Sequence, residues 1–345
     1  MNQDFMKTKP IFPLVLSMSL PMMLSMLINS LYNIIDSMFV ARIGEDALTA
    51  VSLVYPLQTL VVSISVGFGV GINAAVAFFL GAGEKENADR SAAQGLLLSL
   101  LHGALLSVGG FLCIPYFLPL FTSDARILDW GMEYAYIVLS FSMVITVQIA
   151  FEKIYQAVGN MLVPMVCMAA GCITNIILDP VFIFGLGPIP RLEVKGAAIA
   201  TVIGQVVTLI LYLIWYFCKD MGLSLGRRNM KLTGEICGKL YTVGVPCSLT
   251  MGLPSLLITV LNGFAAAFSP VYILILGVYF KLQSFIYLPA NGIVQGMRPI
   301  LSYNYGAGEK KRMRRIIQIC SVMILVIMAA GMLLFLLAPG IIMKL

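Results

Sequence analysis

An internal repeat is the feature that most constrains the fold of this chain. Residues 14–85 of the 345-residue sequence recur without gaps 225 positions later. Gly67 corresponds to Gly292, Gly71 to Gly296, and Gly-Ala-Gly-Glu-Lys at 81–85 to the same five residues at 306–310. Both copies are almost wholly apolar. Repeated sets of long apolar helices are typical of secondary transporters, which bind substrate between the two copies.

The composition indicates that the chain folds in a lipid bilayer. Hydrophobic residues make up 60% of it and charged residues 11%, whereas a typical soluble domain has about 25% charged residues. A helix needs about 20 apolar residues to cross a bilayer. We therefore predict an all-α polytopic membrane protein with about nine transmembrane helices, near residues 12–40, 47–80, 91–120, 130–157, 162–187, 196–218, 238–268, 270–304 and 315–340.

Basic residues predict the orientation of these helices, because short loops rich in Lys and Arg stay in the cytoplasm. With the N-terminus inside, fifteen of them lie on the cytoplasmic side, against five on the other: Arg42, Arg126, Arg191, Lys195 and Lys344. We therefore expect a multi-pass protein of the cytoplasmic (inner) membrane with its N-terminus inside. The net charge of +6 then reflects topology and not a nucleic-acid-binding surface.

The polar stretch at 219–235 divides the chain into two predicted lobes, residues 1–220 with six helices and residues 221–345 with three. Six helices return the chain to its starting side, so the second copy begins in the same orientation as the first and the repeat is parallel. The second copy stops opposite Leu120 of the first. We therefore expect an incomplete C-terminal lobe, short by about a hundred residues.

Two carboxylates interrupt the apolar spans of the first half. Asp36 and Asp179 each lie about 30–38 Å from the cytoplasmic end of their helix, at 1.5 Å per residue. An ionisable group inside a membrane is costly and generally has a function. Asn33 and Asn175 lie one turn before the two acids, and Thr201 adds a hydroxyl. Such an oxygen-rich cluster is expected to bind Na⁺ or to take up H⁺; the alternative is that each acid marks an interfacial helix end.

Four other polar residues have plainer interpretations. Lys281 lies near mid-membrane and is expected to steer cationic cargo or to pair with an acid in absent helices. Glu152 and Lys153 predict a local ion pair at the cytoplasmic end of a helix. His102 is the only histidine, and we expect it to pack or to form a local hydrogen bond.

Glycines in matching positions of the two copies predict close helix packing. Gly67, Gly71, Gly292 and Gly296 form two pairs of small residues four positions apart, which let helix backbones approach closely in lipid. Gly-Ala-Gly-Glu-Lys lacks the spacing of a nucleotide-binding loop. It predicts a helix terminator with glycine in the left-handed conformation.

Several spaced motifs go beyond these general patterns. They are Ser-Leu-Pro at 19–21, Leu-Tyr-Asn-Ile-Ile-Asp-Ser-Met-Phe-Val at 31–40, Asn175 with Asp179-Pro180, Gly-Ala-Ala-Ile-Ala-Thr at 196–201, and the stretch from Pro289 to Ala307. Together they resemble the multidrug and toxic compound extrusion (MATE) family over the whole chain. The resemblance implies two six-helix lobes, without helices 10–12 in this sequence. It also implies a cation-coupling site at Asp36, Asn175, Asp179 and Thr201.

The resemblance further implies a secondary active multidrug efflux transporter that exports organic cations, antibiotics among them, in exchange for Na⁺ or H⁺. Its expected partners are membrane lipids and cationic amphipathic small molecules, and a monomer is expected. No cofactor or metal is expected apart from the coupling ion. If that ion is Na⁺, it is expected to bind Asp36, Asn175 and Asp179. Candidates for lining the substrate cavity are Asn33, Gln58, Lys281 and Gln283.

Three alternatives compete with this function. A flippase for a lipid-linked saccharide has a similar two-lobe plan, but it needs several cationic residues and only Lys281 and Arg298 are available. A non-functional transporter fragment is the second alternative. An intramembrane enzyme is the third, and a single histidine without clustered metal ligands argues against it.

Overall fold

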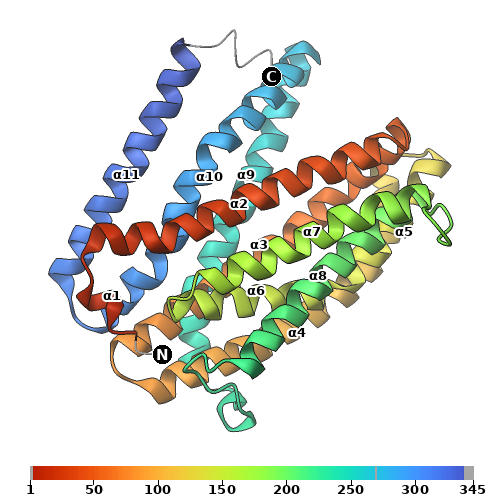
Figure 1. The fold of residues 1–345 in the computed structure, drawn as a ribbon. Helices are drawn as coiled ribbons and strands as arrows, with labels where there is room; N and C mark the ends of the chain where they lie inside the picture. The colour runs from red at the N-terminus through yellow and green to blue at the C-terminus, as the bar shows by residue number, and fades with distance from the viewer. Residues whose placement is uncertain (1–2, 269, 338–345) are drawn as a thin grey trace.

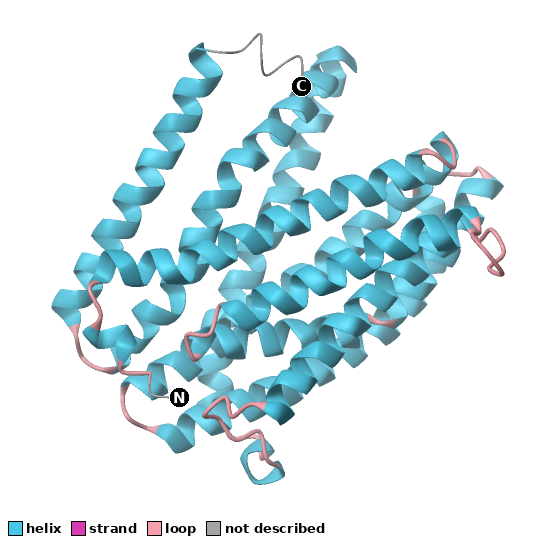
Figure 2. Ribbon diagram, viewed as in Figure 1, coloured by secondary structure: helices cyan, strands magenta, loops and turns pink. Residues whose placement is uncertain are grey.

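The computed structural model describes residues 3–268 and 270–337, and in this part of the chain every regular element is a helix (Figure 1; Figure 2). The long helices are α2 (Ile11–Ala41), α3 (Glu45–Gly81), α4 (Lys85–Phe117), α5 (Ala125–Ser140), α6 (Ser142–Ala157), α7 (Leu162–Phe184), α8 (Glu193–Cys218), α9 (Gly234–Phe268), α10 (Pro270–Gly306) and α11 (Lys310–Leu337). Three short segments are α1 (Phe5–Thr8), η1 (Leu118–Leu120) and η2 (Arg227–Met230). Helices suit so apolar a chain because they satisfy their backbone hydrogen bonds internally.

The long helices have the dimensions of membrane spans. Within the described residues, α2, α3, α4 with η1, α7, α8 and α11 are each long and apolar enough to cross a bilayer. α5 and α6 meet the same test as a pair bent by 45°, so the predicted span at 130–157 is broken. α9 and α10, with 35 and 37 residues, are as long as the others. The prediction of an all-α, multi-pass membrane protein is confirmed.

The repeated glycine turn ends a helix in the same way in both copies. Gly83 and Gly308 adopt φ values of +77° and +73°, which favour glycine because a Cβ would be strained there. The next backbone N–H reaches back five residues in each copy, from Glu84 to the Phe79 carbonyl and from Glu309 to that of Asn304, both at 2.9 Å. The predicted helix terminator is confirmed.

The two copies meet along α3–α9 and α2–α10 through equivalent residues. Gly67 lies against Ser248, and Gly292 lies against Met23; at either glycine an added Cβ would come within 3.0 Å of its neighbour. Ser248 and Met23 are themselves 225 positions apart, so the two contacts are images of each other. A surface that meets its own equivalent is the mark of two-fold symmetry.

One helical turn further on, the same relation recurs. Gly71 lies against the Leu240 carbonyl and the Gly244 backbone nitrogen, and Gly296 lies against Ser19, the equivalent of Gly244, again with no room for a Cβ. In Figure 1, α9, α10 and α11 meet the other helices near the N-terminus and diverge from α3–α8 towards the opposite end. We call the contacts of α9 and α10 with the helices of the first copy, mainly α3–α9 and α2–α10 and also α4–α9 and α6–α10, the seam. A lobe boundary at residue 220 stays a prediction.

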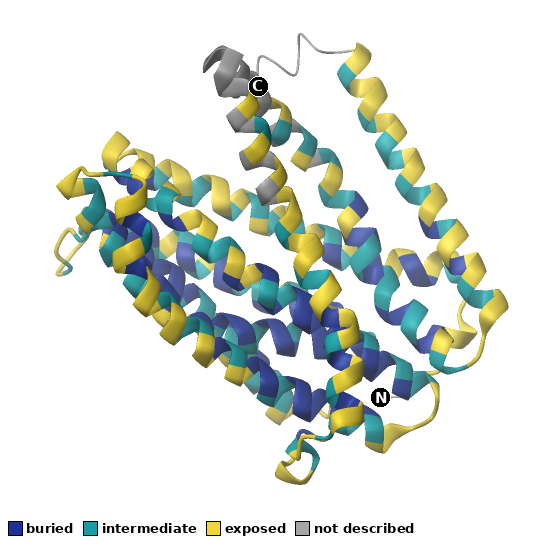
Figure 3. Ribbon diagram, turned by 180° about the vertical axis from the view of Figure 1, so that it is seen from behind, coloured by how far each residue is buried: buried dark blue, intermediate teal, exposed yellow. Residues whose placement is uncertain are grey.

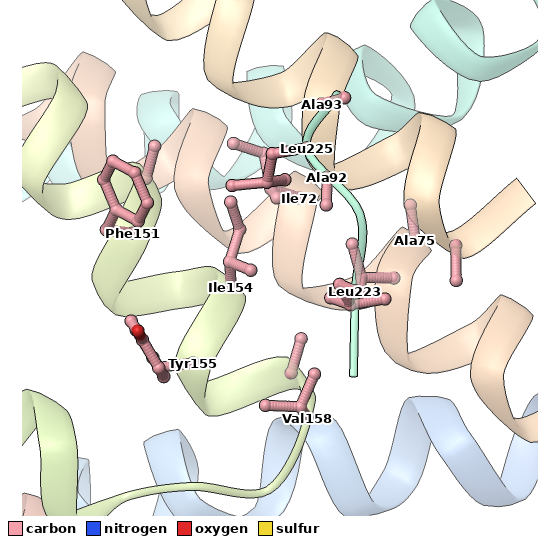
Figure 4. Packing of buried hydrophobic residues seen from close by; sticks show 14 of the residues in the cluster. Ile72, Ala75, Ala92, Ala93, Phe151, Ile154, Tyr155, Val158, Leu223 and Leu225 are labelled. Atoms are coloured by element: carbon pink, nitrogen blue, oxygen red, sulfur yellow. The ribbon is translucent and has the colours of Figure 1, made fainter. Parts of the chain in front are cut away.

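Burial is concentrated between the helices (Figure 3), and many large apolar side chains are exposed on the outside. One buried cluster joins α3, α4, α6 and α8 to the linker after α8, whose Leu223 and Leu225 pack near Ile72 and Ile154 (Figure 4). Large apolar side chains such as Phe217, 79% exposed, cover the outside. This distribution fits a molecule surrounded by lipid, where apolar surface carries no cost.

Candidate functional site

Asp36 and Asp179 are brought together by the packing of α2 against α7. Their carboxyl groups lie close enough to interact with each other. Asp179 is fully buried and Asp36 half-buried. The helices that carry these acids are apolar along nearly their whole length, so the two acids share one low-dielectric environment.

Asn175 and Thr201 complete a cluster of four oxygen-bearing residues with the two acids. Asn175 is 2% exposed and Thr201 on α8 is 7% exposed. The Asn175 side-chain amide donates to the Thr201 hydroxyl at 3.4 Å. The structure thus places Asp36, Asn175, Asp179 and Thr201 in one site, which we call the acid cluster.

The acid cluster contains more acceptors than donors. Four buried oxygens lack a hydrogen-bond partner in the described structure: one of Asp36, both of Asp179 and the amide oxygen of Asn175. No lysine or arginine nitrogen of the described residues lies within 4.0 Å of either carboxylate. Buried acceptors are normally satisfied, and leaving them unpaired is costly. Carboxylate, amide and hydroxyl oxygens are ligands of hard cations, so this donor set fits Na⁺ or one or two protons.

Two tyrosines next to the acid cluster were not found from the sequence. Tyr32 lies one turn before Asp36 and beside Thr201, and Tyr134 on α5 lies near both acids. Tyr134 is 3% exposed, and its hydroxyl accepts from Gln58 of α3 at 3.5 Å. The spacing of four between Tyr32 and Asp36 was a usable signal. Tyr134 had none, because only the tertiary packing of α5 against α3 and α8 brings it near the two acids.

The four candidates for the substrate cavity do not come together. Gln58 lies by Tyr134, at the edge of the acid cluster. Asn33 is exposed and donates to the backbone and side-chain oxygens of Asn29, at 2.7 and 2.9 Å. Gln283 donates to the hydroxyls of Tyr279 and Tyr287 on its own helix. The side chain of Lys281 lies outside the described residues.

A second polar group lies at the seam. Lys153 of α6 donates to Glu152 at 2.7 Å, to Gln156 at 3.2 Å and, across the seam, to Gln295 of α10 at 3.1 Å. The side chains of Lys153 and Glu152 are only 4% and 14% exposed. The predicted local ion pair between Glu152 and Lys153 is confirmed, and α10 contributes a further hydrogen-bond acceptor to it. We call Glu152, Lys153, Gln156 and Gln295 the lysine network.

His102 also makes a contact across the seam. Its Nε2 lies 2.8 Å from the hydroxyl of Tyr241 on α9, and its ring meets Phe68 edge to face. The expectation of packing or a hydrogen bond is confirmed, although the partner is distant in sequence. The seam therefore contains specific polar contacts as well as close helix packing.

Comparison with known proteins gives consistent matches along the chain. The MatE family model matches residues 21–181 and 246–345. The multidrug export protein MepA of Staphylococcus haemolyticus is 26% identical over 329 residues, which cover 95% of this chain and 72% of that protein. An FAD transporter of Shewanella oneidensis is 26% identical over 307 residues, which cover 89% of this chain and 68% of the relative.

Solved structures with the same fold extend these matches. A MOP superfamily transporter from Pyrococcus furiosus, described as having a binding pocket of reverse polarity, superimposes with a TM-score of 0.92. It is 26% identical, over 98% of this chain and 75% of that one. An outward-facing multidrug resistance MATE family transporter gives a TM-score of 0.90 at 25% identity, with the same coverage of both chains.

Proposed function

Because the chain belongs to the MatE family, we propose that it is a secondary active efflux transporter that exports cationic amphipathic compounds in exchange for Na⁺ or H⁺. The observation that carries the proposal is the acid cluster, in which two facing carboxyl groups and an amide leave four buried oxygens without a partner. Buried acids of this kind inside a membrane protein generally mark a site where an ion binds. The similarity to the multidrug export protein MepA, over 95% of this chain, supports drug export as the activity.

The coupling step follows from the two roles of α2. This helix carries Asp36 near its outer end and packs Met23 and Ser19 against α10 at the seam. A cation that binds between Asp36 and Asp179 removes the repulsion between the carboxylates and draws α2 onto α7. Loss of the cation reverses this. Because α2 is one continuous helix, the change reaches the seam, and residues 1–220 and 221–345 rock against each other as a monomer.

Orientation sets the direction of transport. We place the N-terminus in the cytoplasm and the chain in the inner membrane, because the loops on that side carry fifteen of the lysines and arginines against five on the other. The acid cluster then lies in the outer half of the membrane. Cations enter it from the external side, where an inward Na⁺ or H⁺ gradient keeps it occupied while drug is released.

The proposal is tested with the purified chain in proteoliposomes. Efflux of a cationic dye is measured under an imposed Na⁺ gradient and, separately, under an H⁺ gradient. We expect one gradient to drive efflux and Asp36→Asn to reduce it to the level of empty vesicles. Asp129→Asn, which removes an exposed carboxyl from α5, is the matched control and is expected to transport normally. Undiminished efflux by Asp36→Asn would remove the acid cluster from the mechanism.

A second candidate cargo is an anionic dinucleotide. It is favoured by the FAD transporter of Shewanella oneidensis, which is as similar to this chain as MepA is, with 26% identity. The same proteoliposomes distinguish the two classes. Uptake or release of FAD under the gradient, without movement of the dye, would establish the anionic cargo and exclude the cationic one.

A further inference from the structure

A groove lies where the first turns of α2 and α11 come side by side. Residues 10–13 form one wall, and Arg312, Arg315 and Ile319 form the other. The groove has a volume of about 390 Å³, within the range of small-molecule sites. Phe12 is 54% exposed and Ile319 is partly exposed. The groove therefore offers cationic and apolar surface together.

Its arginines have unused hydrogen-bonding capacity. Arg312 donates through one terminal nitrogen to the backbone carbonyls of Met6 and Lys9, which fixes the start of the chain against α11. Its Nε is buried without a partner. Arg315 is exposed and, within the described residues, has no ion-pair partner within 4.0 Å. An arginine pair of this kind presents forked donors suited to a phosphate.

The repeat shows that this charge belongs to the second copy alone. Residues 310–315 read Lys-Lys-Arg-Met-Arg-Arg, with five positive charges, whereas the equivalent residues 85–90 read Lys-Glu-Asn-Ala-Asp-Arg and are neutral. Arg90 of the first copy is paired with Glu86 at 2.6 Å. The basic character of the α11 start is therefore not required by the shared fold.

The corresponding place in the first copy is covered by the chain itself. Asp89 accepts from the Ser224 backbone, and Gln94 bonds to Thr233 and to the Lys231 carbonyl, so the linker after α8 lies over the first turns of α4. In the second copy the equivalents of Asp89 and Gln94 are Arg314 and Ile319. The first copy binds a polar backbone at this position, whereas the second presents the apolar side chain of Ile319 to the groove and has Arg314, which lies outside the groove, in place of the acid.

From this contrast we propose that the groove binds an anionic phospholipid, with its phosphate at Arg312 and Arg315 and its acyl chains along Phe12 and Ile319. The position at the basic ends of two membrane helices is headgroup level, where anionic lipids attract arginine and lysine. An anionic lipid satisfies both surfaces at once. It also bridges α2 to α11 and so joins the two copies at their narrow end.

The test compares two neighbouring arginines. The purified chain is titrated with phosphatidylglycerol in detergent, and bound lipid is counted by native mass spectrometry. We expect Arg315→Gln to weaken binding about fivefold, the effect of one arginine near an anionic lipid. Arg314→Gln removes the same charge one residue away, outside the groove, and is expected to bind like the wild type. Equal losses in both variants would show diffuse attraction and overturn the proposal.

Two further arms identify the ligand and guard against unfolding. Phosphatidylcholine is expected to bind much more weakly, and glycerol phosphate is expected not to displace the lipid; equal binding of either would overturn the assignment. Ile319→Glu places a negative charge in the groove and Gln318→Glu places one beside it on an exposed position. Both variants are monitored for folding by circular dichroism, and only Ile319→Glu is expected to lose phosphatidylglycerol.

Discussion

The acid cluster and the lysine network both hold charged side chains inside the helix bundle, and they satisfy those charges in opposite ways. In the lysine network, Lys153 supplies the cation for Glu152, and Gln156 and Gln295 complete its hydrogen bonds. In the acid cluster, Asp36 and Asp179 face each other with no cationic side chain nearby in the described residues. The lysine network carries its own counter-ion and therefore has a structural role. The acid cluster has no counter-ion of its own in the described residues, so it can bind and release an external cation.

Removal of the cation from the lysine network is the most damaging change. Lys153→Met leaves the carboxylate of Glu152 buried without a cation, and breaking a buried pair in this way costs about 3–5 kcal/mol. We expect a loss of that size in the free energy of unfolding, measured by denaturant titration in micelles. Lys239→Met is the control, because its pair with Glu235 is exposed and such pairs contribute about 1 kcal/mol or less. If both variants lost the same free energy of unfolding, Lys153 would not be the counter-ion that stabilises buried Glu152.

The acid cluster is expected to respond to ions where the lysine network does not. If Na⁺ is the coupled ion, NaCl at a hundredfold excess over its dissociation constant stabilises the protein by about 2.7 kcal/mol. Choline chloride at the same ionic strength is the control. The stabilisation is measured as a shift in melting temperature, and Asp179→Asn is expected to abolish it while Lys153→Met retains it. A shift that survives in Asp179→Asn would place the ion elsewhere.

Packing beneath the lysine network gives a smaller effect. Gly69 of α3 lies under the stem of Lys153, and a Cβ there would come within 2.8 Å of its Cγ. Gly69→Ala therefore displaces Lys153, and we expect a cost of about 1–3 kcal/mol, as for other overpacked sites. Gly109→Ala, where no atom lies within 4 Å of an added Cβ, is expected to be neutral or stabilising. If Gly69→Ala left the free energy of unfolding unchanged, the side chain of Lys153 would be able to move aside without losing its contacts.

The same two regions show what sequence can and cannot predict. The helices were predicted because the length of an apolar run is a local property, although the break between α5 and α6 inside the span at 130–157 was missed. Asp36 and Asp179 were found because an acid in such a run is conspicuous. The ion pair of Glu152 and Lys153 was predicted because the two residues are adjacent, but its burial was not. Burial comes from tertiary contacts, with Gly69 of α3 under the Lys153 stem and with Gln295 of α10, 142 positions away. Tyr134 was missed for a similar reason, since tyrosine is ordinary in a membrane helix.

The smallest effect concerns Tyr134, whose hydroxyl lies between Gln58 and the acids. Tyr134→Phe removes one neutral hydrogen bond, normally worth about 0.5–1.5 kcal/mol. If that hydroxyl orients the acid cluster, the half-saturating concentration of the coupling ion rises about two- to tenfold while the maximal efflux rate stays the same. Tyr136→Phe on the same helix, where the ring of Tyr136 packs against Phe111, should change neither quantity. A lower maximal efflux rate with an unchanged half-saturating ion concentration would instead assign Tyr134 a role in the movement of α5. The acid cluster would then consist of Asp36, Asn175, Asp179 and Thr201 without Tyr134.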